Sequence, residues 1–198
     1  MKIDATQPLE YGTEENRNRI FGFWLFLGAE IALFATLFTV YFVLVNRFAS
    51  GPSGAEIFEI TPVLLETFLL LTSSFTIGLA VHAMRLGLKK QMMIFMIITL
   101  LLGAGFLGIE IFEFFTYVHE GVTLSTSAFS SSLFTLLGTH GAHVTFGLLW
   151  GTAILIQLKK HGLDHSTANK SFIFSLYWHF LDVVWIFIFS FVYLKGLM

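Results

Sequence analysis

The sequence contains no cysteine. This chain therefore forms no disulfide bond and offers no thiolate ligand to a haem, an iron–sulfur cluster or a copper centre. Charged residues are also scarce, since they make up 12% of the 198 residues, and the formal net charge is -2. Nucleic-acid binding relies on a surplus of Lys and Arg, so this charge balance argues against a nucleic-acid partner.

Hydrophobic residues dominate instead. They make up 56% of the chain, Phe alone accounts for 24 residues, and the mean hydropathy is +0.79. A bilayer core about 30 Å thick needs roughly 20 apolar residues per helix. Five stretches reach that length, and none shows the polar–apolar alternation of a barrel strand: residues 20–46, 62–86, 91–118, 129–158 and 172–194. We therefore predict an all-α polytopic membrane protein, with a polar cytoplasmic segment over 1–19 and one domain of five transmembrane helices over 20–198.

Lysine and arginine set the predicted orientation, because they gather in the cytoplasmic loops of membrane proteins. If the N-terminus is inside, only Arg47 and Lys195 of the 11 basic residues fall outside, and nine fall inside: Lys2, Arg17, Arg19, Arg85, Lys89, Lys90, Lys159, Lys160 and Lys170. We predict a cytoplasmic N-terminus and an outer C-terminus. Residues 1–19 lack the apolar core of a signal peptide, so the first apolar helix is expected to direct insertion.

Nine acidic residues and histidines lie inside the predicted helices, where an ionisable side chain costs on the order of 2.5 to 3.5 kcal/mol at the bilayer centre. They are Glu30 in the first helix, Glu66 and His82 in the second, Glu110 and Glu113 in the third, His140 and His143 in the fourth, and His179 and Asp182 in the fifth. At 100° per residue, Trp178 and Trp185 share a stripe with His179 and Asp182. The face of the fourth-helix histidines continues through Gly147 and Gly151, whose spacing suits close helix packing. We expect the two stripes to face each other or a common interior.

Three roles are compatible with these nine residues. Our main expectation is that they hydrogen-bond across the bundle and hold the helices in place. A proton relay is the second role, and a ligand site is the third, either for lipid headgroups or for a metal or haem bound by the two H-x-x-H/D pairs. We rank metal low, because helical E-x-x-H pairs of the di-iron kind are absent. We predict no catalytic residue and no metal site in this chain.

Two short motifs carry little weight. Gly103, Gly105 and Gly108 match a nucleotide-binding pattern, but they lie in an apolar helix with no strand ahead of them, so they indicate close helix packing. Asn169 begins a glycosylation sequon that falls in a predicted inner loop.

Five segments, taken in order, resemble the signature blocks of subunit III of the haem–copper terminal oxidases. They read GFWLFLGAE at 22–30, LLLTSSFTIGLA at 69–80, GFLGIEIFEF at 105–114, LGTHGAHVTFG at 137–147 and YWHFLDVVW at 177–185. The fourth block begins with Leu137, and this residue before the first glycine makes the block more similar to the quinol oxidase branch than to the cytochrome c oxidase branch. The five helices resemble the short bacterial form, which lacks the first two helices of longer members.

The resemblance implies an accessory subunit of a proton-pumping quinol oxidase, located in the bacterial cytoplasmic membrane and acting in aerobic respiration. In that family subunit I carries the haems and copper, and subunit III has no redox centre but stabilises subunit I, holds phospholipid and supports proton uptake. The implied partners are subunits I, II and IV and membrane lipids. Glu30 matches the family's membrane carboxylate, and His140, His143, His179 and Asp182 fall in two later blocks.

Three alternatives stay open. One is a small transporter that uses Glu30 and Asp182 as proton carriers, which is disfavoured because no inverted repeat is visible. The chain could be subunit III of a cytochrome c oxidase. From another class, it could be a membrane cytochrome b or a quinone-binding anchor, with one histidine of the fourth helix and one of the fifth as axial haem ligands.

Overall fold

The computed structural model describes residues 8–48, 51–52 and 54–197, and in that part of the chain every regular element is a helix. Five helices are long and apolar enough to cross a membrane, which confirms the predicted fold class. They are α1 (Glu14–Leu44), α3 (Ile60–Arg85), α4 (Lys89–His119), α5 (Ala128–His161) and α6 (His165–Ile188), and α6 continues as the π-helix η2 (Phe189–Leu194). The short η1 (Leu9–Tyr11) precedes α1, and α2 (Gly54–Ile57) precedes α3. Lys2 and the rest of residues 1–7 lie outside the described residues.

Two helices begin well before their apolar stretches. α1 begins at Glu14 rather than at residue 20, because Thr13 accepts a hydrogen bond from the Asn16 backbone N–H at 3.1 Å and caps the helix. α6 begins at His165 rather than at residue 172, because Asp164 accepts a bond from the Thr167 backbone N–H at 2.7 Å. Residues 14–19 thus belong to α1. Hydropathy marks the part of a helix that suits hydrocarbon, whereas capping decides where the helix begins.

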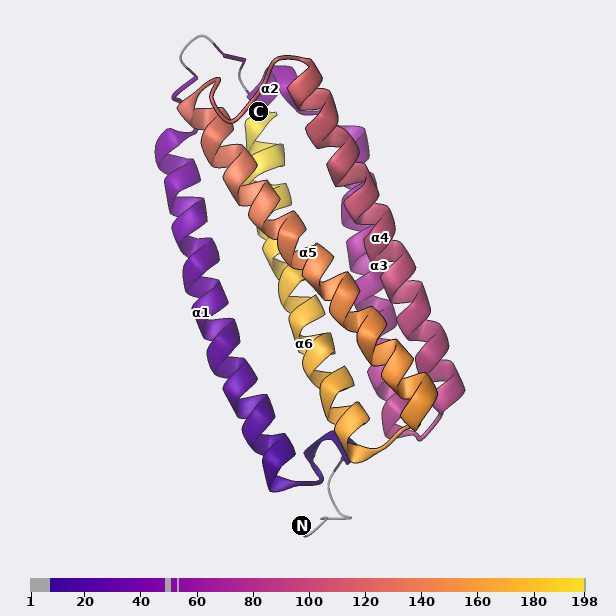
Figure 1. Cartoon of the computed structure of the whole chain (residues 1–198). Coiled ribbons are helices and arrows are strands. Elements are labelled where there is room, and N and C mark those ends of the chain that lie inside the picture. The colour runs from indigo at the N-terminus through magenta and orange to yellow at the C-terminus, as the bar shows by residue number, and fades with distance from the viewer. Residues whose placement is uncertain (1–7, 49–50, 53, 198) are drawn as a thin grey trace.

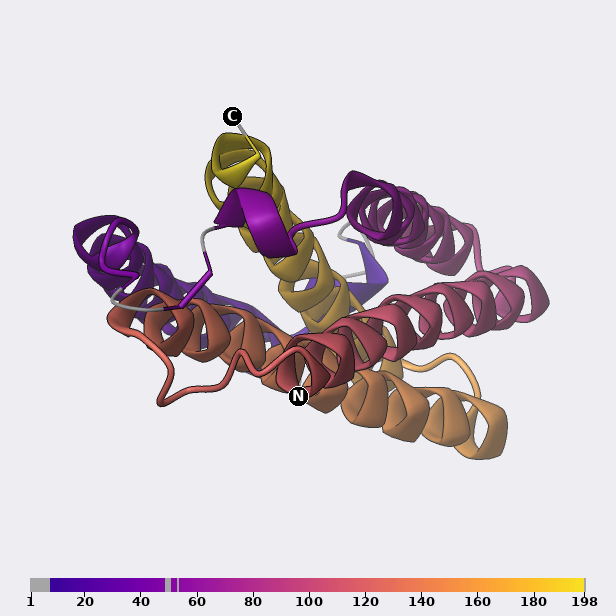
Figure 2. The same ribbon diagram turned by 90° about the horizontal axis from the view of Figure 1, so that it is seen from above.

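The helices form two rows. α1, α6 and α3 lie in one row, and α5 and α4 lie in the other, as the view along the bundle shows (Figure 2). α6 packs against α1, α3 and α5 and is the most buried spanning helix, whereas α1 is the least buried. The N- and C-terminal ends of the described chain lie at opposite ends of the bundle (Figure 1), as five passes require. The cytoplasmic placement of the N-terminus stays a prediction.

α3 and α4 form a tight helical hairpin. The chain turns at Gly87, whose φ of +72° is a left-handed conformation that favours glycine. Inside the hairpin, the hydroxyls of Thr76 and Thr99 are hydrogen-bonded at 2.7 Å. This pair of helices is one wall of the space that holds the α6 stripe.

Candidate functional site

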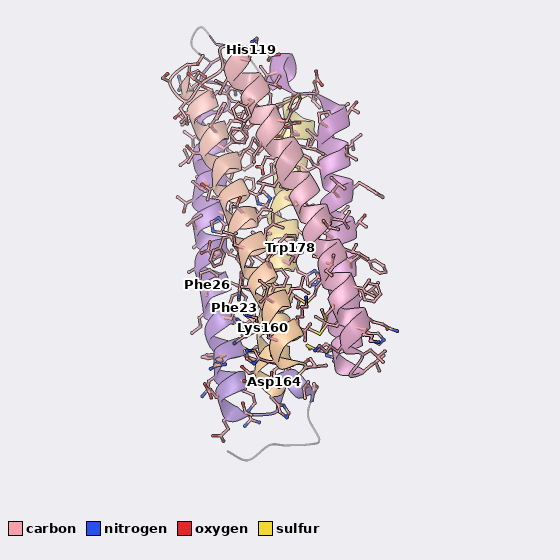
Figure 3. All side chains as sticks on the ribbon, turned by 45° about the vertical axis from the view of Figure 1, so that its right-hand side comes forward. Phe23, Phe26, His119, Lys160, Asp164 and Trp178 are labelled. Atoms are coloured by element: carbon pink, nitrogen blue, oxygen red, sulfur yellow. The ribbon has the colours of Figure 1, made fainter. Side chains whose placement is uncertain are left out.

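Trp178 lies near the centre of the bundle, between the ends marked by His119 and Asp164 (Figure 3). The indole is 1% exposed, and its Nε1–H donates to Ser73 Oγ of α3 at 2.9 Å. Two glycines make room for the ring, because a Cβ would lie 2.6 Å from it at Gly103 of α4 and 3.0 Å from it at Gly147 of α5. One side chain of α6 therefore joins three other helices.

Trp185 makes a second junction two turns along α6. Its Nε1–H donates to Thr67 Oγ1 of α3 at 3.0 Å. The His140 ring stacks on this indole with centroids 5.6 Å apart and an interplanar angle of 28°, and Phe106 meets both rings edge-on. His140 is fully buried, and neither ring nitrogen has a hydrogen-bond partner among the described residues. Aromatic packing, rather than a polar contact, holds this imidazole.

His179 and Asp182 face α3 rather than the α5 histidines. The Nδ1 atom of His179 is hydrogen-bonded to Ser74 Oγ at 2.7 Å, and the buried Asp182 lies beside the same serine. The α5 and α6 stripes face each other where Trp185 meets His140 and where Trp178 meets Gly147. His143, His179 and Asp182 do not follow that expectation. The partners that the sequence analysis missed are Ser and Thr hydroxyls of α3, and the signal that points to them is the run of Thr72, Ser73, Ser74 and Thr76 in an apolar helix.

His143 joins α5 to α1. Its Nε2 atom lies 3.1 Å from Glu30 Oε2, and its Nδ1 atom lies 2.7 Å from the Thr139 carbonyl oxygen. A carbonyl only accepts, so Nδ1 carries a hydrogen. The contact with Glu30 then holds one further proton, either on Nε2 or on the carboxyl group, and the pair is neutral overall in both cases. It is also partly exposed, with side-chain exposures of 22% for His143 and 13% for Glu30.

Three carboxyl groups lie together near the C-terminal end of α4, close to η2: those of Glu66, Glu110 and Glu113. Glu66 is 0% exposed, Glu110 3% and Glu113 7%, and the three are close enough for their charges to interact. The hydroxyls of Tyr193 and Tyr117 donate to Glu113 Oε2 at 3.1 and 3.4 Å. Neither oxygen of Glu66 or Glu110 has a hydrogen-bond partner within the described part of the chain.

His82 differs from the other eight ionisable residues, because its side chain is exposed and our expectation of burial was wrong for it. It lies in the last turn of α3, next to the buried residues Ala83 and Met84. Gly151 lies in the core, where a Cβ would come within 2.7 Å of both Phe174 and Leu100. Small size is thus what α5 needs at this position.

A polar network at the end of the bundle where α1 and α6 begin was not predicted from the sequence. The Glu10 carboxylate is fully buried and pairs with Arg85, whose Nε and Nη2 lie 2.9 and 2.8 Å from Oε1. Asn169 donates to the backbone oxygens of Glu10 and Asn16 at 3.0 and 3.1 Å. The sequon asparagine is therefore a buried fastening between η1, α1 and α6. Partners 75 and more residues apart leave no local signal in a sequence.

The arrangement of these groups favours contacts between helices. Among the described residues, no three His, Cys, Asp or Glu side chains come together in a way that suits a metal ion. Apart from the exposed His82, the nine residues fall instead into separate contacts, each of which links at least two helices.

Comparison with known proteins covers almost the whole chain. Residues 11–197 match the sequence model of the family described as cytochrome c oxidase subunit III. "Quinol oxidase subunit 3" of Bacillus subtilis (strain 168) is 63% identical over 194 residues, which are 98% of this chain and 95% of that protein. "Cytochrome c oxidase subunit 3" of Bacillus sp. (strain PS3) is 51% identical over 190 residues, 96% of this chain and 92% of the relative. "Probable quinol oxidase subunit 3" of Staphylococcus saprophyticus is 50% identical over 198 residues, 100% and 98% of the two chains.

Proposed function

We propose, since this chain belongs to the cytochrome c oxidase subunit III family, that it is the accessory subunit III of a haem–copper quinol oxidase. The complex oxidises quinol and reduces oxygen to water, and this chain is a multi-pass protein of the bacterial cell membrane. The observation that carries the choice of donor is the identity to relatives: 63% and 62% for two quinol oxidase subunits, against 51% and 50% for two cytochrome c oxidase subunits.

The geometry supports an accessory role. His179 and His143 are bonded to Ser74 and Glu30, and His140 is enclosed by aromatic rings. These imidazoles serve contacts between helices, as expected of a subunit that stabilises a complex. The haems and copper of the complex then belong to subunit I, and that placement stays part of the proposal.

The same contacts weigh against the cytochrome b alternative. An axial haem ligand needs open space in front of a ring nitrogen, and the rings of Trp185, Phe106 and Phe34 pack around His140. The cytochrome c oxidase alternative differs only in the electron donor. A cysteine-bound copper site in the accompanying subunit II would decide for it.

The least buried helix, α1, offers a surface for lipid and subunit contacts. A groove of about 480 Å³ runs between α1 and α6, and its walls are apolar apart from His179. Trp24, Phe38, Phe180 and Phe187 are among the residues that line it. We propose that it takes an acyl chain of a membrane phospholipid, and that subunit I is the main protein partner in a complex with subunits II and IV. Stabilising subunit I and sustaining proton uptake are the implied consequences.

Purification of the tagged chain from its own membranes in mild detergent tests this function. We expect a large haem-bearing subunit to accompany it, with oxygen consumption driven by a quinol and not by reduced cytochrome c. The matched control is the tagged Gly103→Leu variant, whose disrupted packing should release the haem protein. Absence of a haem protein from the wild-type preparation would refute the proposal, and activity with cytochrome c alone would refute the choice of donor.

A further inference from the structure

We propose that Glu66, Glu110 and Glu113, with Tyr117 and Tyr193, form a buried site that binds protons reversibly and exchanges them with the aqueous phase at the α3 N-terminal end of the bundle. We call these five residues the carboxyl cluster. Its ligands are protons, and at least two are bound when the protein is at neutral pH.

The cluster is assembled by three elements. α4 contributes Glu110, Glu113 and Tyr117, η2 contributes Tyr193, and α3 contributes Glu66. Both phenol hydroxyls donate to the same oxygen of Glu113, Oε2. Two donors on one oxygen suit a carboxylate, so Glu113 is the member best able to carry negative charge.

Glu66 is an independent indication that the cluster takes a ligand. It reaches the α4 carboxyls from another helix, it is fully buried, and neither of its oxygens is hydrogen-bonded within the described residues. Glu110 is also buried, and neither of its oxygens is hydrogen-bonded within the described residues. It lies against the backbone of α5, since a Cβ at Gly141 would lie 2.8 Å from its Oε2. A protonated carboxyl loses its charge and gains a donor, which removes most of the cost of such a place.

The lack of a positive counter-charge near the three carboxyl groups favours protons over a metal ion as the bound ligand. No lysine, arginine or histidine within the described chain forms an ion pair with any of the three carboxyls. Three carboxylates side by side in a membrane would repel one another and would each lose their hydration. A metal ion is the other possible counter-charge, but these carboxyls do not converge as a metal-binding group. Protons meet the need without such convergence.

A carboxylate at the surface connects the cluster to water. Glu59 precedes the first turn of α3, is exposed, and lies close enough to Glu113 for their charges to interact. Glu113 is therefore the central member, with Glu110 and Glu66 on its buried side and Glu59 towards the end of the bundle. On the α5 side, the backbone at Gly141 lies against the Glu110 carboxyl group.

Infrared spectroscopy of the purified chain, with the subunits that accompany it, tests the proposal. The carbonyl stretch of a protonated carboxylic acid is separate from the carboxylate bands and shifts in D₂O. We expect Glu66→Gln and Glu110→Gln each to remove one protonated-acid band at neutral pH, and Glu59→Gln to remove none while slowing the D₂O shift of those that remain. Glu14→Gln, an exposed change at the other end of the bundle, is the control for both measurements.

Proton counting gives a second measurement that does not depend on band assignment. On alkaline titration, the wild-type protein should release at least two more protons per chain than the triple variant Glu66→Gln, Glu110→Gln and Glu113→Gln. Equal release, or single variants that lose only carboxylate bands, would show that the carboxyls are ionised and would overturn the site. An unchanged D₂O shift in Glu59→Gln would overturn the exchange route. Circular dichroism confirms beforehand that each variant is folded.

Discussion

Gly103→Ala should loosen the bundle, although alanine is normally the better residue in a helix. The added methyl would lie 2.6 Å from both Cη2 and Cζ2 of Trp178, where carbon atoms in contact are about 3.5 to 4.0 Å apart. The indole has no room to move away, because it is buried and its N–H is held by Ser73. α4 and α6 must therefore separate by about 1 Å, and overpacking of this kind costs about 1 to 3 kcal/mol.

Gly108→Ala is the matched control on the same helix. A Cβ at Gly108 meets no atom within 4 Å, so this change should be neutral or should stabilise the helix by up to about 1 kcal/mol. The two substitutions are chemically identical and are expected to have opposite signs. The comparison isolates the contact with Trp178 from the helix preference of alanine.

Unfolding of the purified protein in mixed micelles of increasing SDS content, followed by circular dichroism, measures both effects. Gly103→Ala should raise the unfolding constant by roughly 5- to 160-fold, which corresponds to about 1 to 3 kcal/mol. Trp178→Phe removes the two clashing ring atoms, so the double variant should be more stable than the sum of the single effects predicts. Equal stability of Gly103→Ala and Gly108→Ala, or strict additivity with Trp178→Phe, would refute the reasoning.

Three further predictions concern the polar contacts. Glu30→Gln should destabilise the protein by about 1 to 3 kcal/mol. A double-mutant cycle with His143→Phe should show a coupling energy, and additive effects of the two changes would contradict the proton shared by Glu30 and His143. Arg85→Met should leave the buried Glu10 carboxylate without its partner at a cost of about 1 to 3 kcal/mol, because the Arg85 side chain is half exposed. Glu10→Gln in the same chain should recover most of that loss, and limited proteolysis of the N-terminal segment measures both effects. Hydrogen bonds from the Thr167 side chain and backbone lower the pKa of Asp164, so the stability that this cap contributes is complete above about pH 4 and is lost as the pH falls through the lowered value. Asp164→Asn should keep the cap but abolish that acid-dependent loss of α6 stability, as measured by thermal unfolding. Asp164→Ala should cost about 1 kcal/mol near neutral pH. An unchanged acid dependence in the asparagine variant would contradict the role of the Asp164 carboxylate.

The spanning helices were predictable because membrane insertion depends on the length and composition of a local stretch. Their ends were less so. Thr13 and Asp164 extend α1 and α6 through polar turns, and a hydropathy threshold does not register capping. The stripe of Trp178 and Trp185 followed from periodicity alone, since both side chains are indeed buried on one side of α6.

The partners of that stripe were not predictable. Serine and threonine occur in many apolar helices, and their hydroxyls usually bond to the carbonyl one turn back, as Thr72 does with Phe68. Only the packed structure shows that Ser73 and Ser74 form hydrogen bonds with Trp178 and His179 of α6. Gly103 has the same chemistry as Gly108, and the difference between them is the indole that lies against one of the two.

Composition and local pattern by themselves determined that this chain crosses the membrane five times, and they placed nine carboxyl and imidazole side chains in its spanning helices, of which His82 is exposed. Tertiary structure alone decided what those residues do. His140 and His143 lie three positions apart, yet one is enclosed by aromatic rings and the other bonds Glu30. Glu66 and Glu113 come from different helices and share one buried cluster. The physical reason is that pairing depends on how each helix is rotated about its axis, and that rotation is set by glycine and tryptophan contacts between residues far apart in the sequence.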